Sequence, residues 1–250
     1  MRRPVTHPLA LRRLRDARLE DGSVDPLAAA IAIATHARPR LSIGEVIEKI
    51  EGFAREVRAM AAIGSDGEAG GGNAMAGVAN HVLFDRHGFR GNRERYGDPQ
   101  NSYIDCVLKQ KTGLPILLSL IYVETVRRAG GVAHGIGLPG HIVAAVDEGG
   151  RRVLVDAFDG GKHLTVDDCR KIAEGAGASW SEEYLEPVDG RKWVMRMLAN
   201  LRNVYAQMGD AANLAAVVEQ MILLAPEMGG LQEELARVYG WLDEQAAKNN

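Results

Sequence analysis

The sequence contains little cysteine, few aromatic residues and no long hydrophobic run. Only two cysteines, Cys106 and Cys169, occur among its 250 residues. They are too few for a disulfide framework or for a structural zinc site, which usually takes about four ligands. No stretch approaches the roughly 20 apolar residues of a membrane span, and no signal-peptide core is present. We therefore expect a cytoplasmic protein with no metal, no cofactor and no membrane partner.

An excess of charge of one sign is also lacking. The 30 basic and 33 acidic side chains leave a formal net charge of -3, so no overall field attracts nucleic acid. Arginines cluster near the N-terminus, but a solvated tail and first helix account for them better than an anion-binding arm does. The remaining composition, 46% hydrophobic and 25% charged, is typical of a globular protein with one large domain or two small ones.

Patterning divides the chain into four stretches. Helical periodicity indicates a helical opening segment, and the run GSDGEAGGGN indicates a flexible connector. Helical patterns are then followed by short strand-like segments, and the chain ends in three helical patterns. The predicted ranges are 1–63 for the opening segment, 64–74 for the connector, 75–187 for a mixed core and 188–250 for a helical tail.

The core contains one strongly apolar helix, PILLSLIYVETVRRAGG. Pro115 occupies a first-turn position, Arg127 and Arg128 fall in the last turn, and Gly130 marks the end. A helix that is apolar nearly all round is buried at the centre of a domain.

Two strand-like segments follow and flank residues 147–150, whose composition indicates a hairpin loop. With a symmetric loop, Val146 pairs with Arg151, and counting outward sets His141 opposite Asp156. Opposed side chains have Cβ atoms about 5 Å apart. An imidazole and a carboxylate so placed can form the orienting half of a catalytic triad.

Three segments resemble the SirB-type transglutaminase-like proteins of bacteria, whose domain also occurs in a eukaryotic F-box protein. They are LFDRHGFRGNRERYGDPQNSYIDCVLKQKTGLPILLSLIYVETVRRAGG, GIGLPGHIVAAV and VDAFDGGKHL, and the resemblance covers about residues 75–165. It implies an α+β fold with a papain/transglutaminase-like core, in which a central helix packs against an antiparallel sheet.

The resemblance also implies where a catalytic site would lie. His141 and Asp156 match the histidine and aspartate positions of active members of the wider superfamily. The nucleophilic cysteine position falls at about Pro115, and proline cannot attack a carbonyl. The leading hypothesis is therefore a non-catalytic binding or regulatory module. The alternative is a thiol hydrolase or acyltransferase that uses Cys106 with His141 and Asp156.

Other candidates have structural explanations beside the functional one. Ser119 lies one helical turn beyond Pro115 and is the nearest hydroxyl, although a small packing residue explains it better. Cys169 has acidic neighbours, which raise a thiol pKa. Polar residues that could line a pocket are Asn92, Tyr96, Asn101 and Ser119, of which turn and cap roles explain most.

The tail has partial repeat character. The spacing from Tyr205 to Pro226 is that of the tyrosine and terminal proline of a tetratricopeptide repeat, although the tryptophan and glycine positions are not met. This predicts a tetratricopeptide-like tail. Because a single helix pair cannot bury its own face, the tail packs on the core or binds a protein or peptide partner.

Overall fold

The computed structural model describes residues 5–63 and 74–248. These residues form two compact units, each assembled from separate parts of the chain. The first unit comprises Met1–Leu41, Gly97–Asp105 and Asp189–Asn250, and the second comprises Ser42–Tyr96 and Cys106–Val188. This interleaved division differs from the sequential ranges expected from the sequence. The connector expected at 64–74 lies, except for Ala74, outside the described residues.

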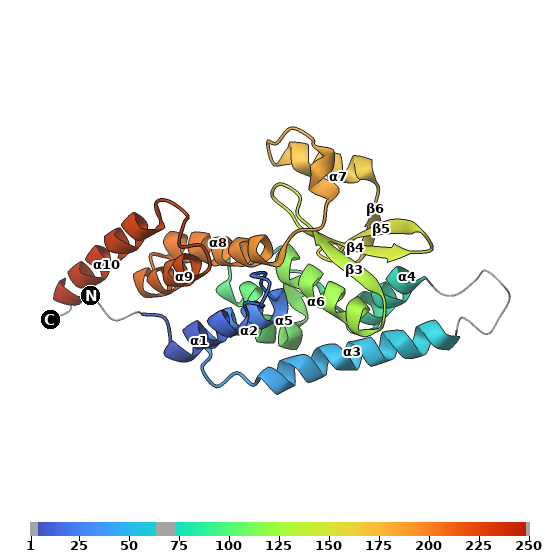
Figure 1. The fold of residues 1–250 in the computed structure, drawn as a ribbon, viewed down its shortest axis with the longest axis horizontal. Helices are drawn as coiled ribbons and strands as arrows, with labels where there is room; N and C mark the ends of the chain where they lie inside the picture. The colour runs from blue at the N-terminus through green and yellow to red at the C-terminus, as the bar shows by residue number, and fades with distance from the viewer. Residues whose placement is uncertain (1–4, 64–73, 249–250) are drawn as a thin grey trace. The chain divides into compact units, whose positions relative to one another are not determined.

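The second unit is built on an antiparallel sheet with both faces covered. Its strands follow the order β3 (Val132–Ile136), β4 (Val143–Glu148), β5 (Arg151–Asp156) and β6 (Lys162–Leu164). Helix α6 (Pro115–Arg128) packs against β3 and β4 (Figure 1). An apolar cluster on the sheet includes Cys169 of helix α7 (Val166–Gly175). The expected mixture of helices and antiparallel sheet is therefore confirmed.

The position of strand β4 in the sheet explains why residues 143–146 form a continuous apolar run. Successive side chains of a strand point to opposite faces of the sheet. Val143 and Ala145 belong to the cluster with Cys169, so Ala144 and Val146 point to the other face. All four are buried. A strand covered on both faces needs apolar residues at every position.

Helix α6 has the boundaries that its sequence predicts. It begins with Pro115 at its first position and has Arg127 and Arg128 in its last turn. Gly130 follows in a left-handed conformation with φ of 100°, which glycine adopts without a Cβ penalty. Eleven of the 14 helix residues are buried, so the expected central, buried helix is confirmed.

The hairpin between β4 and β5 has a different register from the predicted one. Glu148 pairs with Arg151, so the loop is the two-residue turn Gly149-Gly150, with φ values of 57° and 74°. Two residues with positive φ fit the tight turn that matches the twist of the strands. The predicted pairing of Val146 with Arg151 was therefore wrong by two positions, because the loop is shorter than the four residues assumed.

The rest of the second unit packs around this core. Helix α3 (Ile43–Ile63) contacts α6 and α4 (Met75–Asn80), and α4 continues into the π-helical turn η1 (His81–Arg86). Strand β1 (Arg90–Gly91) pairs in parallel with β2 (Thr112–Gly113). Two further elements are α5 (Ile104–Gln110), which spans the boundary between the units, and the 3-10 turn η3 (Glu182–Leu185).

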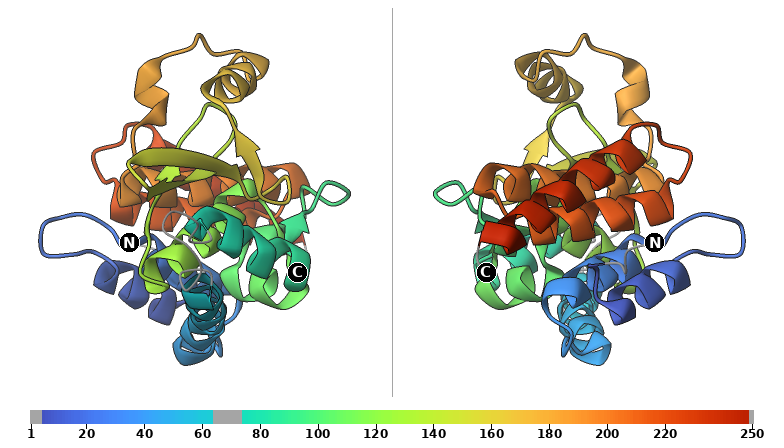
Figure 2. Two further views of the ribbon diagram at one scale, coloured as in Figure 1. Left: turned by 90° about the vertical axis from the view of Figure 1, so that its right-hand side faces the viewer. Right: turned by 90° about the vertical axis from the view of Figure 1, so that its left-hand side faces the viewer.

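The first unit is helical. Its elements are α1 (Pro8–Asp16), α2 (Pro26–Ala37), the 3-10 turn η2 (Pro99–Ser102), α8 (Gly190–Met208), α9 (Ala211–Leu224) and α10 (Leu231–Lys248). Helix α9 packs against both α8 and α10, as the orange and red ribbons show (Figure 2). A hydrogen bond between the hydroxyl groups of Tyr103 and Tyr205 joins the segment Gly97–Asp105 to α8.

Arginines of the N-terminal region contact the protein's own polar groups. Arg13 donates to the Thr35 hydroxyl over 2.6 Å, and Arg18 donates to the carbonyl of Leu223 over 3.0 Å. The second contact lies at the C-terminal end of α9, where carbonyl groups have no partner within the helix. These contacts favour a structural role for both arginines. No helix within residues 5–63 and 74–248 is long and apolar enough to cross a bilayer.

Candidate functional site

His141 and Asp156 contact each other in the second unit. The Nε2 atom of His141 lies 3.0 Å from Oδ2 of Asp156, and the two side chains are 16% and 10% exposed. The two residues are not opposite each other in the strand register, because His141 precedes β4 and Asp156 ends β5. The sequence thus predicted the right partners from an incorrect register. A bond through Nε2 orients the ring so that Nδ1 is the nitrogen facing away from the carboxylate.

Asp156 has a second set of partners in the turn that follows β5. Its Oδ1 atom accepts hydrogen bonds from the backbone N–H groups of Phe158, over 2.9 Å, and Asp159, over 3.3 Å. Burial by itself raises the pKa of this carboxyl group. The hydrogen bond and charge of His141 and the two N–H groups outweigh it, so the pKa of Asp156 lies below its ordinary value. Asp156 is therefore held ionised, and it stabilises the turn as well as the histidine.

His141 is positioned by the tight turn before it. Gly140 has φ of 68°, and the His141 N–H donates to the carbonyl of Leu138 over 3.2 Å. The imidazole lies edge-on to the ring of Phe158, with centroids 6.2 Å apart. His141 and Asp156 line a hollow of about 350 Å³, which we call the histidine hollow. Its other lining residues are Arg93, Pro139, Gly140, Phe158, Asp159, Ile172, Gly175 and Ala176.

The start of α6 supplies no nucleophile to this hollow. Pro115 is the first residue of the helix and is buried. Ser119, one turn further along, is fully buried, and its Oγ donates to the backbone carbonyl of Ile142 over 3.1 Å. Because residues four apart share a helix face, this bond turns the face carrying Pro115 and Ser119 toward the segment that carries His141. The hydroxyl of Ser119 has a structural partner there.

The two cysteines lie on other helices. Cys106 belongs to α5, is 3% exposed, and is not among the residues that line the histidine hollow. Cys169 is buried on α7, where burial and the nearby carboxylates of Asp168 and Asp156 raise the pKa of its thiol to about 11. A thiol with such a pKa is almost entirely protonated at neutral pH and is a weak nucleophile.

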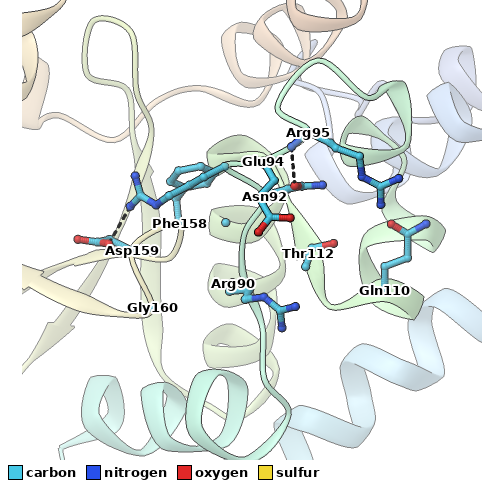
Figure 3. Close-up of a pocket in the computed structure, with 11 residues that line it drawn as sticks. Arg90, Asn92, Glu94, Arg95, Gln110, Thr112, Phe158, Asp159 and Gly160 are labelled. Carbon is cyan, nitrogen blue, oxygen red and sulfur yellow. Dashed lines mark hydrogen bonds and ion pairs between the residues drawn. The ribbon is translucent and has the colours of Figure 1, made fainter.

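A larger hollow adjoins the histidine hollow. It has a volume of about 710 Å³, and we call it the arginine hollow. Its lining residues are Arg90, Gly91, Asn92, Arg93, Glu94, Arg95, Gln110, Thr112, Phe158, Asp159 and Gly160, most of which Figure 3 labels. Its arginines are not among the site residues that the sequence predicts, although all three belong to the dense run FRGNRER.

Close packing fixes the wall of the arginine hollow. A Cβ atom on Gly91 would lie 2.6 Å from both the ring and the carbonyl oxygen of Phe158, so only glycine fits. The Gly91 N–H donates to that same carbonyl over 3.1 Å. Strand β1 is thereby held between β2 and the turn after Asp156, which joins the arginine hollow to the His141–Asp156 pair.

The predicted pocket residues are not all brought together. Asn92 lines the arginine hollow, and its side chain accepts a hydrogen bond from the backbone N–H of Arg95. Tyr96 is 49% exposed and lies edge-on to Phe158. Asn101 is buried in η2, within the first unit. Within residues 5–63 and 74–248, no group of three or more histidine, cysteine or acidic side chains is placed to hold a metal ion.

Comparison with known proteins shows the family. Residues 44–199 match the model of the transglutaminase-like superfamily. This match spans more than half of the chain and includes α6, the four-stranded sheet, His141 and Asp156. The chain therefore belongs to the transglutaminase-like superfamily.

Curated relatives come from bacteria and animals. A UPF0162 protein of Xylella fastidiosa is 32% identical over 158 residues, which cover 61% of this chain and 56% of that protein. A UPF0162 protein of Pseudomonas aeruginosa is 23% identical over 218 residues, covering 86% and 77%. Mouse F-box only protein 21 is 32% identical over 130 residues, covering 49% of this chain and 20% of that protein. The chain thus matches about half the length of the Xylella protein. No solved structure matches it.

Proposed function

We propose that this transglutaminase-like protein is a binding module that does not catalyse acyl transfer. One observation carries the proposal: the helix face turned toward the segment that carries His141 offers a proline and a serine whose hydroxyl is buried and bonded to the Ile142 carbonyl. Nucleophilic catalysis needs a thiol or hydroxyl within about 3 Å of its base. Neither Pro115 nor Ser119 supplies one.

The His141–Asp156 pair has a different use in a binding module. A histidine oriented by a carboxylate is a well-placed hydrogen-bonding group at the wall of a cavity. Asp156 also has a structural role, because it accepts two N–H groups of the turn at Phe158 and Asp159. The pair can therefore serve ligand binding and fold stability without any bond being broken.

We further propose the SirB-type assignment within the superfamily and a tetratricopeptide-like character for the tail. The similarity to F-box only protein 21 supports the first, since the SirB-type domain also occurs in an F-box protein. The helix–turn–helix of α8 and α9, with α10 packed on α9, supports the second. Such helix pairs bind protein or peptide segments, and we propose a partner of that kind for α8–α10. Exposed large side chains there include Met208 and Met228.

The thiol-enzyme alternative depends on Cys106 working with His141. Cys106 is 3% exposed and belongs to α5 rather than to the start of α6. This burial and placement do not favour the alternative, but it makes a separate prediction. Activity would disappear in Cys106→Ala and in His141→Ala alike.

Restoring a thiol at position 115 tests the proposal. The variant Pro115→Cys, made with Cys106→Ala and Cys169→Ala, is compared with the same protein carrying His141→Ala. We expect iodoacetamide to alkylate the introduced thiol at pH 6.5 at least about tenfold faster when His141 is present, because an imidazole lowers the pKa of a facing thiol. Equal rates would show that position 115 does not face His141 and would remove the main support.

The unmodified protein provides the other half of this test. We expect no release of ammonia from a glutamine peptide with an amine acceptor, and no hydrolysis of a thioester. Turnover that is lost in His141→Ala would refute the proposal. Simultaneous loss in Cys106→Ala would establish the thiol enzyme instead.

A further inference from the structure

The arginine hollow and the histidine hollow have a common wall. Arg93, Phe158 and Asp159 line both of them. The Arg93 guanidinium lies over the Phe158 ring at 4.9 Å and pairs with Asp159 over 2.8 Å. This ion pair therefore stands between two adjoining cavities, and a ligand bound in one extends naturally toward the other.

The charged side chains that line the arginine hollow include more arginines than carboxylates. Three arginines line it, at positions 90, 93 and 95, against the two carboxylates Glu94 and Asp159. Asp159 is already paired with Arg93. Among the residues that the structure describes, Arg90 has no ion-pair partner. An arginine without an ion-pair partner on the wall of a cavity attracts an anion.

Neutral hydrogen-bonding groups complete the lining. The side chains of Arg90, Arg95, Thr112 and Gln110 border one open space, with Asn92 and Glu94 beside it (Figure 3). A volume of about 710 Å³ far exceeds a single inorganic anion and falls in the range of sites that hold a drug-sized ligand or a few residues of a peptide. Alternating charged, amide and hydroxyl groups suit a chain that carries several polar groups.

We propose that the arginine hollow binds a peptide segment with oxyanion side chains, carboxylate or phosphate, and directs the adjoining part of that peptide toward His141. Arg90 is the principal anion-binding residue, since a guanidinium binds either oxyanion through two parallel hydrogen bonds. This inference rests on the proposed binding function, for which it names the ligand class.

The backbone that carries Arg90 is fixed before any ligand binds. Arg90 N–H donates to the carbonyl of Lys111 over 2.9 Å, and Gly91 N–H donates to that of Phe158. Arg90 is also in register with Thr112 across the β1–β2 pair. A guanidinium projecting from such a fixed strand loses less freedom on binding than one on a loop, which favours affinity.

Fluorescence anisotropy with labelled peptides tests the proposal. Three ten-residue peptides are compared: one alternating Glu and Gly, one with phosphoserine in place of each Glu, and one with Gln in place of each Glu. We expect one or both anionic peptides to bind and the Gln peptide to bind at least about tenfold more weakly, because hydrogen bonds to charged groups exceed about 1.4 kcal/mol. The anionic peptide that binds more tightly shows whether the preferred oxyanion is carboxylate or phosphate.

Matched arginine variants locate the binding. Arg90→Ala should weaken binding of the anionic peptide at least about tenfold. Arg90→Lys should weaken this binding less, because a lysine keeps the charge but not the paired hydrogen bonds. Arg151→Ala removes the same charge from the exposed β5 end of the hairpin and should change affinity less than about twofold. Circular dichroism verifies that each variant is folded.

Several results would overturn the proposal. They are equal binding of the Gln peptide, equal effects of Arg90→Ala and Arg151→Ala, no binding of either anionic peptide, and inorganic phosphate binding as tightly as the peptides. None of these bears on acyl transfer. A failed peptide experiment with an inactive protein removes this inference alone, whereas turnover dependent on His141 removes the proposed function.

Discussion

The two sides of the His141–Asp156 site have opposite characters. On the sheet side, a histidine and an ionised carboxylate remain in contact at 3.0 Å and face a cavity. On the helix side, the first turn of α6 holds Pro115, and Ser119 one turn further along is buried with its hydroxyl bonded to the Ile142 carbonyl. The sheet side holds a histidine oriented by a carboxylate, whereas neither Pro115 nor Ser119 presents a free thiol or hydroxyl to it.

The difference follows from what each side contributes to the fold. Asp156 accepts three hydrogen bonds, from His141 and from the N–H groups of Phe158 and Asp159. The turn that it holds supplies the ring and carbonyl packed on Gly91. A residue at the first position of α6 needs no side-chain hydrogen bond, and proline suits that position well. The His141–Asp156 pair therefore contributes to the fold whether or not it has a chemical role, and Pro115 contributes to the start of α6.

The largest effect should come from breaking the sheet side. Asp156→Ala removes a buried carboxylate and leaves His141 and two N–H groups without their acceptor. We expect a loss of about 3 kcal/mol in the free energy of unfolding, measured by urea denaturation. His141→Ala should cost roughly 1 kcal/mol, because Asp156 keeps its turn contacts. Equal losses in the two variants would show that the turn contacts contribute nothing.

The acid side of the pH profile should depend on Asp156. Its pKa in the folded protein lies below the ordinary value of 3.8, so its contribution to stability is present above about pH 4 and is lost as the pH falls through the folded pKa. Asp156→Asn lacks this titration. The difference in unfolding free energy between the wild type and Asp156→Asn should shrink as the pH falls from about 5 toward 2. A difference that is constant over this range would contradict the assignment.

The sequence predicted local features of the site better than its long-range geometry. Pro115, the arginines of the last turn and the buried character of α6 follow from helix patterning, and the structure confirms them. The hairpin register did not follow, because a glycine pair makes a two-residue turn and the prediction assumed a four-residue loop. His141 and Asp156 still meet, since the segment before β4 and the end of β5 lie together at one end of the hairpin.

The arginine hollow could not be derived from local patterns. Its walls come from β1, from β2 and from the turn at Phe158, which are far apart in the sequence. The parallel β1–β2 pairing, the close contact of Gly91 with Phe158 and the Arg93–Asp159 ion pair bring them together. The dense run of arginines was a signal of local charge. The enclosure of the arginine hollow depends on packing between distant segments, which no sequence periodicity reveals.

The smallest effect should come from the helix side, and it separates a structural hydroxyl from a chemical one. Ser119→Ala removes the hydrogen bond to the Ile142 carbonyl and should cost about 1 kcal/mol in urea denaturation. Thr125→Val on the same helix is the matched control. The Oγ1 atom of Thr125 is buried without a partner among the described residues, so its removal should be neutral or stabilising. If the Ser119 hydroxyl instead had a chemical role, Ser119→Ala would leave stability unchanged and alter peptide binding or turnover. If Ser119→Ala lowers only the free energy of unfolding, the Ser119 hydroxyl has a structural role and this face of α6 contributes packing alone to the site.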